Sequence, residues 1–525
     1  MKRIASLTML IVFIFFCQSC AVIDRIKDSA QKFIKTEETL TATTEFSEKP
    51  NIINAGIYDF DTFNPLTTKS QSVKEAMQFV YEPLFKLDSE MRIVPVLAKD
   101  YTVSADGKII TINLKENIKW HDATPFSASD VAYTIKVILN GETNYTDSLL
   151  NLKNYIEISD YSIRLILKNS VPSYESLLTF PIIKNKTKMN TREEYIPNGT
   201  GPFCYGSRAS VDEIYFGAYE NYHQGRSRID ALYIHMLPSY DSYMTSLEAS
   251  EIDFASSKTV DLTEYMPKGN LKLYDYTSNQ FTFLGYNMES PILSGSFTRR
   301  ALAKVIDKEE IADSVIFSRG VATDIPINPD SYLYTDTNVK FSKDDLAAND
   351  YLGDDNWGTD INGNYVRKIN GAKQTLKFTI LANSDNHEEM MVAKNISEQF
   401  GRFGIDAEVE ALPYEIYKSR VKTKNYEIFV GTVEMDANMN LSGFFDTLGY
   451  KNDNISILMS QLGMTRNEEE LRALFNQYTA MLLEDMPITV LYFSKGSLIS
   501  SANVISGINP TEHSIFNDSS LWSVR

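Results

Sequence analysis

Histidine, cysteine and tryptophan are scarce in this sequence, and their scarcity excludes several kinds of chemistry. The 525 residues include five histidines, three cysteines and three tryptophans. No two histidines form a His-Glu-x-x-His pair, and none is near Cys204 or a Gly-x-Ser-x-Gly elbow. His and Met form no cluster at metal-ligand spacing, and the run from 354 to 363 lacks the acid spacing of a calcium loop. The sequence therefore predicts no enzyme, no metal and no cofactor.

A basic surface is also missing. The 51 Lys and Arg residues face 69 Asp and Glu residues, which gives a net charge of −18 at pH 7. No basic patch interrupts this acidity, so nucleic acid and anionic membrane surfaces are excluded as partners. Aromatic residues are abundant by contrast, with 30 Tyr and 28 Phe. Tyr-rich surfaces suit binding clefts, although tyrosines that simply fill core and surface explain the number as well.

The N-terminus carries the features of a secretory signal. Lys2 and Arg3 precede an apolar run, Ile4 to Phe16, that is shorter than the roughly 20 residues of a membrane-spanning helix. The following Cys17-Gln18-Ser19-Cys20 resembles a lipobox, so residues 1–20 are predicted to be a lipoprotein signal with Cys20 as the lipidated residue. A signal cleaved without lipidation is the alternative. Residues 21–49 are polar and are expected to form a flexible tether.

The stretch from 92 to 139 has the clearest local pattern. The whole chain of 525 residues is too long for one core, so two or three lobes are expected. Within the stretch from 92 to 139, several local signals follow one another. Asp106-Gly107 predicts a tight turn, and Ile110, Ile112 and Leu114 alternate with polar residues as in a half-buried strand. Ser127 and Asp130 form a capping box, after which Val131, Ile135, Ile138 and Leu139 fall on one helical face.

The C-terminal half alternates strands with helices. Strands are expected over 376–381, 405–412 and 426–431, and helices over 388–403 and 414–421. This order predicts a parallel α/β sheet, whose ligands bind beyond the carboxyl ends of the strands. The pattern therefore indicates the segment 432–440 as a ligand-binding loop.

Three ordered motifs resemble the family 5 extracellular solute-binding proteins of ABC transporters, of the oligopeptide- and dipeptide-binding type. The first comprises Pro95-Val96-Leu97-Ala98, Asp106-Gly107, Trp120-His121-Asp122-Ala123, Pro125 and Asp130-Val131, with Ala123 where the family usually has Gly. The second is the run from Gly199 to Phe203, and the third the run from Phe297 to Lys308. The resemblance runs from about residue 51 to the C-terminus.

This resemblance implies a two-lobed α/β fold, like that of the class II periplasmic binding proteins, with an extra N-terminal subdomain. Lobe I is expected over residues 50–275, including a peripheral subdomain at about 85–185. Lobe II is expected over 276–490, and residues 491–525 are expected to return and complete lobe I. A monomer is expected.

The resemblance further implies a lipoprotein that captures oligopeptides between its lobes and delivers them to the permease subunits of an ABC importer. It would stand on the outer, periplasmic side of the bacterial cytoplasmic membrane, held by lipid on Cys20. A peptide-sensing or surface-interaction lipoprotein is the alternative, and a secreted hydrolase is the least supported one.

The expected site of ligand binding follows from the same resemblance. In peptide-binding relatives a carboxylate in the loop after the strand ending near Gly431 holds the peptide ammonium, which makes Asp436 the first candidate and Glu434 the second. Both acids could instead be solvated loop residues. Asn64, Tyr286, Asn287 and Tyr492 are further cleft candidates by position alone.

Overall fold

The computed structural model describes residues 50–141, 143–189, 195–258, 271–335, 342–501 and 504–524. The predicted signal, Cys20 and the tether lie outside these residues. Residues 51–525 form one compact unit. None of the helices within the described ranges combines the length and apolar character needed to cross a membrane.

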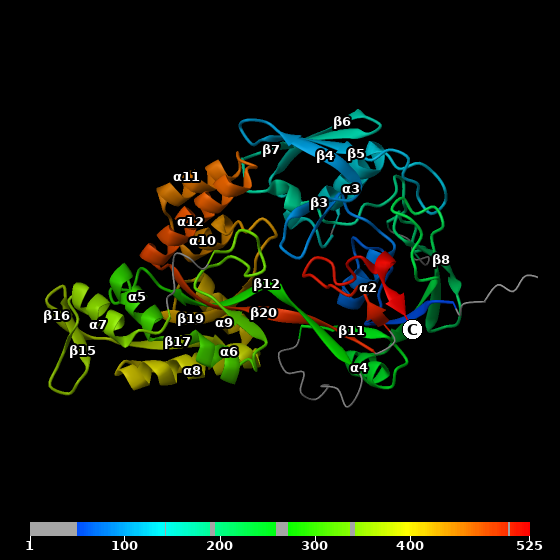
Figure 1. Cartoon of the computed structure of the whole chain (residues 1–525). Coiled ribbons are helices and arrows are strands. Elements are labelled where there is room, and N and C mark those ends of the chain that lie inside the picture. The colour runs from blue at the N-terminus through cyan, green and yellow to red at the C-terminus, as the bar shows by residue number, and fades with distance from the viewer. Residues whose placement is uncertain are drawn as a thin grey trace, which may run out of the picture. The chain divides into compact units, whose positions relative to one another are not determined.

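One large sheet of eleven strands organises the molecule (Figure 1). Ten of its strands follow one another across the sheet in the order β18 (Asp406–Leu412), β17 (Lys377–Asn383), β19 (Ile428–Glu434), β12 (Lys272–Tyr286), β20 (Ile488–Ser500), β11 (Phe254–Ser257), β1 (Ile52–Tyr58), β10 (Ala231–Leu237), β9 (Glu213–Ala218) and β8 (Phe203–Arg208). The eleventh strand, β13 (Gly320–Ala322), pairs with β20. Two large hydrophobic cores lie along this sheet, one for each lobe, and a third, smaller cluster includes Tyr243 and Leu247.

The long strands β12 and β20 connect the two lobes and pair antiparallel with each other. The sequence indicates separate strands over 271–276 and 281–287, on either side of the polar run Thr277-Ser278-Asn279-Gln280, whereas β12 is one strand. This run is instead an irregularity within the strand, where the pairing register shifts between Thr277 and Phe281. The Asn328 amide donates to Ser278 O at 3.1 Å and to Asn279 Oδ1 at 2.8 Å, which compensates for the interrupted ladder.

The second lobe contains the predicted parallel strands. β17 pairs in parallel with both β18 and β19, which confirms the order of strands and helices read from the sequence. The eight helices described in this lobe are α5 (Ser296–Val305), α6 (Lys308–Ser314), α7 (Asp345–Asp354), α8 (His387–Phe403), α9 (Tyr414–Lys422), α10 (Ser442–Leu448), α11 (Asp453–Leu462) and α12 (Glu468–Asp485), and a small sheet adds β14 (Gly358–Thr359), β15 (Tyr365–Ile369) and β16 (Ala372–Thr375).

The first lobe adds a four-stranded antiparallel sheet to the main one. Its order is β4 (Ala98–Val103), β5 (Ile109–Leu114), β7 (Ser162–Leu167) and β6 (Leu152–Ser159), and α3 (Ala128–Asn140) packs against it. The predicted capping box is present, since Asp130 Oδ2 accepts from the Ser127 N–H at 2.9 Å. The remaining elements are α2 (Gln71–Ala76), η1 (Met77–Phe79), β2 (Phe85–Leu87), β3 (Ile93–Pro95), η2 (Asp147–Leu149), η3 (Tyr174–Leu177) and α4 (Tyr240–Glu248).

The apolar residues over 73–85 have helical spacing, but the helix in the structure is shorter. α2 ends at Ala76, a single 3₁₀ turn continues to Phe79, and the chain then passes through Pro83 into β2. Pro83 disfavours helical backbone in the residue before it and offers no N–H for the helix ladder. A helix that continued to residue 85 would therefore have Pro83 in its interior, where proline is disfavoured.

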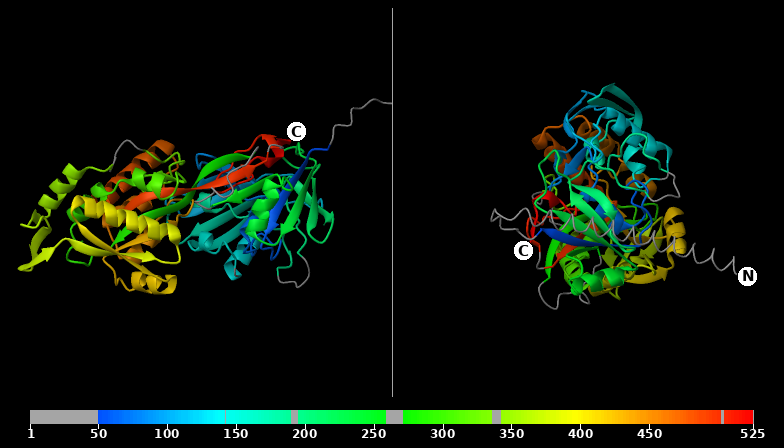
Figure 2. Two further views of the ribbon diagram at one scale, coloured as in Figure 1. Left: turned by 90° about the horizontal axis from the view of Figure 1, so that it is seen from below. Right: turned by 90° about the vertical axis from the view of Figure 1, so that its right-hand side faces the viewer.

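The C-terminal segment returns to the first lobe. β20 is followed by β21 (Val504–Ser506), η4 (Ser519–Leu521) and β22 (Ser523–Val524). Trp522 is fully buried, and its ring lies edge-on to Phe79 at 6.4 Å and to Phe254 at 5.1 Å between ring centroids. Figure 2 shows this red segment beside the blue N-terminal strand β1. Residues from both ends of the sequence thus build one core.

Candidate functional site

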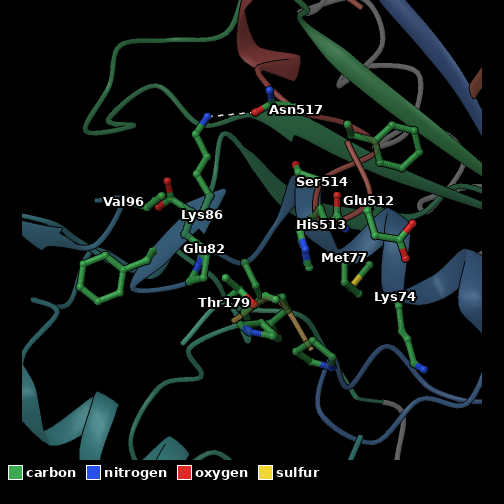
Figure 3. A pocket seen from close by; sticks show the side chains of 18 of the residues that line it. Lys74, Met77, Glu82, Lys86, Val96, Thr179, Glu512, His513, Ser514 and Asn517 are labelled. Carbon is green, nitrogen blue, oxygen red and sulfur yellow. Dashed lines mark hydrogen bonds between the residues drawn. The ribbon is translucent and has the colours of Figure 1, made fainter. Parts of the chain in front are cut away.

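A cavity of about 640 Å³ opens between three groups of residues. One wall comes from the first lobe (around α2, β2, η2 and η3), a second from residues 434–437 after β19, and the third from the C-terminal segment 512–520. Figure 3 shows Glu512 and His513 of that segment beside Met77 and Lys74. The volume lies in the range of ordinary small-ligand sites.

The end of β19 directs two carboxylates toward this cavity. β19 pairs with β12 as far as Glu434, and the next N–H, that of Met435, donates to Asn279 O at 2.9 Å. The Met435 side chain is buried in the second lobe. Its neighbours Glu434 and Asp436 line the cavity, together with Met435 itself and Ala437.

Negative charges from both lobes meet at Asp436. Burial raises the pKa of Asp436, and the nearby charges of Asp147 and Glu434 raise it further. Asp147 begins η2 in the first lobe, whereas Asp436 belongs to the second. Because like charges raise one another's pKa, a cation placed between these carboxylates would stabilise their ionised forms.

The C-terminal wall holds an ion pair and a neutral histidine. Lys258 Nζ lies 2.7 Å from Glu512 Oε1, and burial raises the pKa of Glu512. Burial lowers the pKa of His513 to about 4, so its ring is neutral at pH 7. The Asn279 amide donates to His513 Nε2 at 3.1 Å.

The first-lobe wall is braced by fixed hydrogen bonds. Glu82 Oε1 accepts from Tyr222 OH at 2.8 Å, and the His223 ring contacts both of its oxygens at 3.0 Å. Lys86 Nζ donates to Asn517 Oδ1 at 3.0 Å, drawn as the dashed line in Figure 3, and to Asp518 Oδ1 at 2.8 Å. These bonds tie the C-terminal segment to the rim of the cavity.

The motifs recognised in the sequence pack together beside this wall. The His121 N–H donates to Gly199 O at 2.9 Å, and the Gly201 N–H donates to Val80 O at 2.9 Å. A Cβ at Gly199 would stand 1.8 Å from Val80 O, so only glycine allows this approach. The neighbouring Tyr81 and Pro202 line the cavity. The Gly-Thr-Gly run thus allows close backbone packing, which positions neighbouring residues that line the cavity.

Four of the six candidate cleft residues do not line the cavity. Asn64 is buried and accepts the Leu66 N–H at 3.1 Å, although the adjacent Pro65 does line it. Three others make internal bonds in the second lobe: Tyr286 OH to Thr489 Oγ1 at 2.7 Å, the Asn287 amide to Tyr426 O at 2.9 Å, and Tyr492 OH to Glu388 Oε1 at 2.5 Å. The structure therefore brings together Asp436 and Glu434, and sequence reasoning missed Asp147, Lys258, Glu512 and His513.

A second group of buried acids lies at the start of α8. Burial raises the pKa of Glu389 to about 7, and the charge of the neighbouring Glu388 adds to this effect. Within the described ranges, Glu389 Oε2 has no hydrogen-bond partner. Neither acid lines the cavity. Among all the residues that the structure describes, no group of three or more His, Cys, Asp or Glu side chains is arranged to hold a metal ion.

Comparisons with known proteins agree with this architecture. The family described as bacterial extracellular solute-binding proteins, family 5, matches residues 92–456. The oligopeptide-binding protein AppA of Bacillus subtilis is 21% identical over 99% of this chain and 98% of its own, and heme-binding protein A of Haemophilus influenzae is 23% identical over 81% and 80%. The unliganded open form of MppA, a periplasmic murein tripeptide binding protein, superposes with a TM-score of 0.77 at 15% identity, over 91% of this chain and 98% of that one.

Proposed function

Since the chain belongs to the family 5 bacterial extracellular solute-binding proteins, we propose that it captures short peptides in the 640 Å³ cavity and delivers them to the permease of an ABC importer. The family supports binding and transport as the general role. The relative AppA is named for oligopeptides, whereas heme-binding protein A is named for heme, so the ligand class has to come from the site itself.

The observation that supports the peptide assignment is the cluster of three carboxylates, those of Asp436, Glu434 and Asp147. A peptide has one obligatory cation, its terminal ammonium, and burying that group is costly unless an anion pairs with it. Asp436 is the best-placed anion, because burial and its two acidic neighbours raise its pKa, which would fall once an ammonium lies among them. Heme carries two carboxylates and would be repelled here.

The long strands provide for closure around the ligand. β12 and β20 are the central pair between the lobes, and the register shift near Thr277 gives that pair a bend. Rotation about such a bend would bring Asp147 and Asp436 to opposite sides of one ligand. Outside the described residues, Cys20 would carry the lipid anchor and residues 21–49 would hold the binding unit away from the membrane.

Native mass spectrometry of the full-length protein in mild detergent tests this proposal. Denaturing the purified protein should release peptides of a few residues, and a single non-peptide mass would refute the peptide assignment. Asp436→Asn should weaken binding of such a peptide by about ten-fold or more, as is common when one partner of a buried charge pair is lost. Glu398→Gln, which removes one exposed acid from α8 far from the cavity lining, is the matched control. Unchanged affinity in Asp436→Asn would remove this residue from the site.

A further inference from the structure

A smaller cavity of about 240 Å³ lies next to the one described above, and its lining is strongly acidic. It is formed by residues 88–91, by β12 around Tyr276, by Asn328 and Asp330, and by the C-terminal residues 509–513. Four carboxylates line it: Asp88, Asp275, Asp330 and Glu512. No Lys or Arg is among its lining residues.

Three of these four carboxylates are held in place by the surrounding protein. Asp275 Oδ1 pairs with Arg319 Nη1 at 2.7 Å. Asp330 Oδ2 accepts the Thr277 N–H at 2.9 Å, and Asp88 Oδ1 accepts the Arg92 N–H at 2.8 Å. Backbone N–H groups orient Asp88 and Asp330 without cancelling their charges, so two fixed anions remain.

Glu512 is the fourth carboxylate, and it connects the two cavities because it lines both. Its side chain is 10% exposed, and Oε1 is paired with Lys258. Its other oxygen, Oε2, is buried and has no hydrogen-bond partner among the residues that the structure describes. An unsatisfied buried acceptor costs about 1–3 kcal/mol, and more when it is charged. A donor from a bound ligand would remove this cost.

The arrangement of these acids fits an organic cation better than a metal ion. Nowhere in the described ranges do three or more acidic, His or Cys side chains gather closely enough to hold a metal. The four carboxylates are instead distributed around a cavity of about 240 Å³, which has room for a flexible side chain with several N–H donors. A lysine ammonium has three such donors and a guanidinium has five.

We propose that the smaller cavity binds a cationic side chain, that of lysine or arginine, of a peptide whose terminal ammonium lies beside Asp436 in the larger cavity. This inference rests on the peptide-binding function proposed above and names the class of peptide. Glu512 stands at the junction and accepts from the cationic group through Oε2. Asp88 and Asp330 supply the attracting charge.

Titration calorimetry on the full-length protein in mild detergent tests this assignment. The ligands are alanine tetrapeptides that carry one lysine at each position in turn, each compared with the same peptide carrying norleucine. Norleucine keeps the apolar stem of lysine and lacks the ammonium. At one position the lysine peptide should bind about ten-fold more tightly, which corresponds to about 1.4 kcal/mol.

Two variants separate this subsite from the ammonium site. Glu512→Gln and Asp88→Asn each remove a charge and keep an acceptor oxygen, so each should reduce the preference for lysine to about three-fold or less. Asp88 does not line the larger cavity, so Asp88→Asn should also leave the norleucine peptide's affinity unchanged. Asp436→Asn should weaken both peptides equally, and Glu398→Gln neither. If Glu512→Gln fails to fold, as judged by circular dichroism, Asp88→Asn carries the test.

The outcomes are distinguishable. Equal affinity for lysine and norleucine peptides at every position would overturn the basic side-chain pocket while peptide binding stands. A lysine preference that survives in both variants would likewise overturn this location of the pocket. Failure of every peptide to bind would instead overturn the peptide-binding function itself, and the present inference with it.

Discussion

Glu389→Gln is a change whose effect on stability can be worked out from the structure. Glu389 lies in the first turn of α8 and is 6% exposed. Burial raises its pKa to about 7 in the folded protein, from a model-peptide value of 4.5. The folded state therefore holds a proton on Glu389 at pH values where the unfolded chain releases it.

The sign and size of the effect follow from this difference. A raised pKa of an acid contributes stability that is complete below about pH 4.5 and is lost as the pH rises through about 7. One pKa unit corresponds to about 1.4 kcal/mol, so ionised Glu389 costs on the order of 2–3 kcal/mol at pH 8. Glutamine resembles the protonated acid in shape and cannot ionise. The variant should match the natural protein at pH 4.5 and exceed its free energy of unfolding at pH 8.

Urea unfolding at pH 4.5, 6 and 8 measures this difference. Other acids whose pKa is raised, such as Asp436, titrate in both proteins, so the difference between the two curves isolates Glu389. Glu398→Gln, an exposed acid of the same helix, is the control. A gain for Glu389→Gln that is the same at all three pH values, or a loss at pH 8, would refute the argument from burial.

Three further predictions concern the packing around the site. Ala123 has φ +64, so Ala123→Gly should raise the free energy of unfolding by up to about 1 kcal/mol, and a lower urea midpoint would contradict this. Gly199→Ala would press a Cβ against Val80 O, and thermal unfolding should occur well below that of the natural protein; an unchanged melting temperature would show that the loop can move. Arg466→Met leaves the fully buried Glu175 unpaired, which should cost about 3–5 kcal/mol, and the added change Glu175→Gln should restore part of it in a double-mutant cycle.

The local structure of this protein is largely legible in its sequence. The alternation of Ile110, Ile112 and Leu114 and the Ser127–Asp130 box depend on neighbours a few residues away, and both are confirmed. The continuous strand β12 was missed because its polar middle is supported by Asn328, about fifty residues further along the chain. Propensity cannot report such a partner.

The candidate site likewise combines residues that the sequence indicates with residues that only long-range contacts bring together. Asp436 could be selected because a strand end and a family resemblance both indicate its loop. Glu512 and Lys258 are 254 residues apart in the sequence, and neither belongs to a motif. Their contact is seen only in the folded structure. The unpaired oxygen of Glu512 suggests a ligand only because Glu512 lines a cavity. Tyr286 and Tyr492 are the opposite case, since their positions in the sequence suggest a cleft and the structure buries both.

The C-terminal return has a consequence for how the chain is made. Lys86 bonds Asn517 across 431 residues, and Trp522 completes the aromatic cluster with Phe79 and Phe254. The first lobe therefore cannot complete its core until Asn517 and Trp522 have been synthesised. Contacts of such long range also make folding slow. During synthesis the core of the first lobe therefore stays incomplete for most of the length of the chain, and an incomplete core disfavours early closure of that lobe.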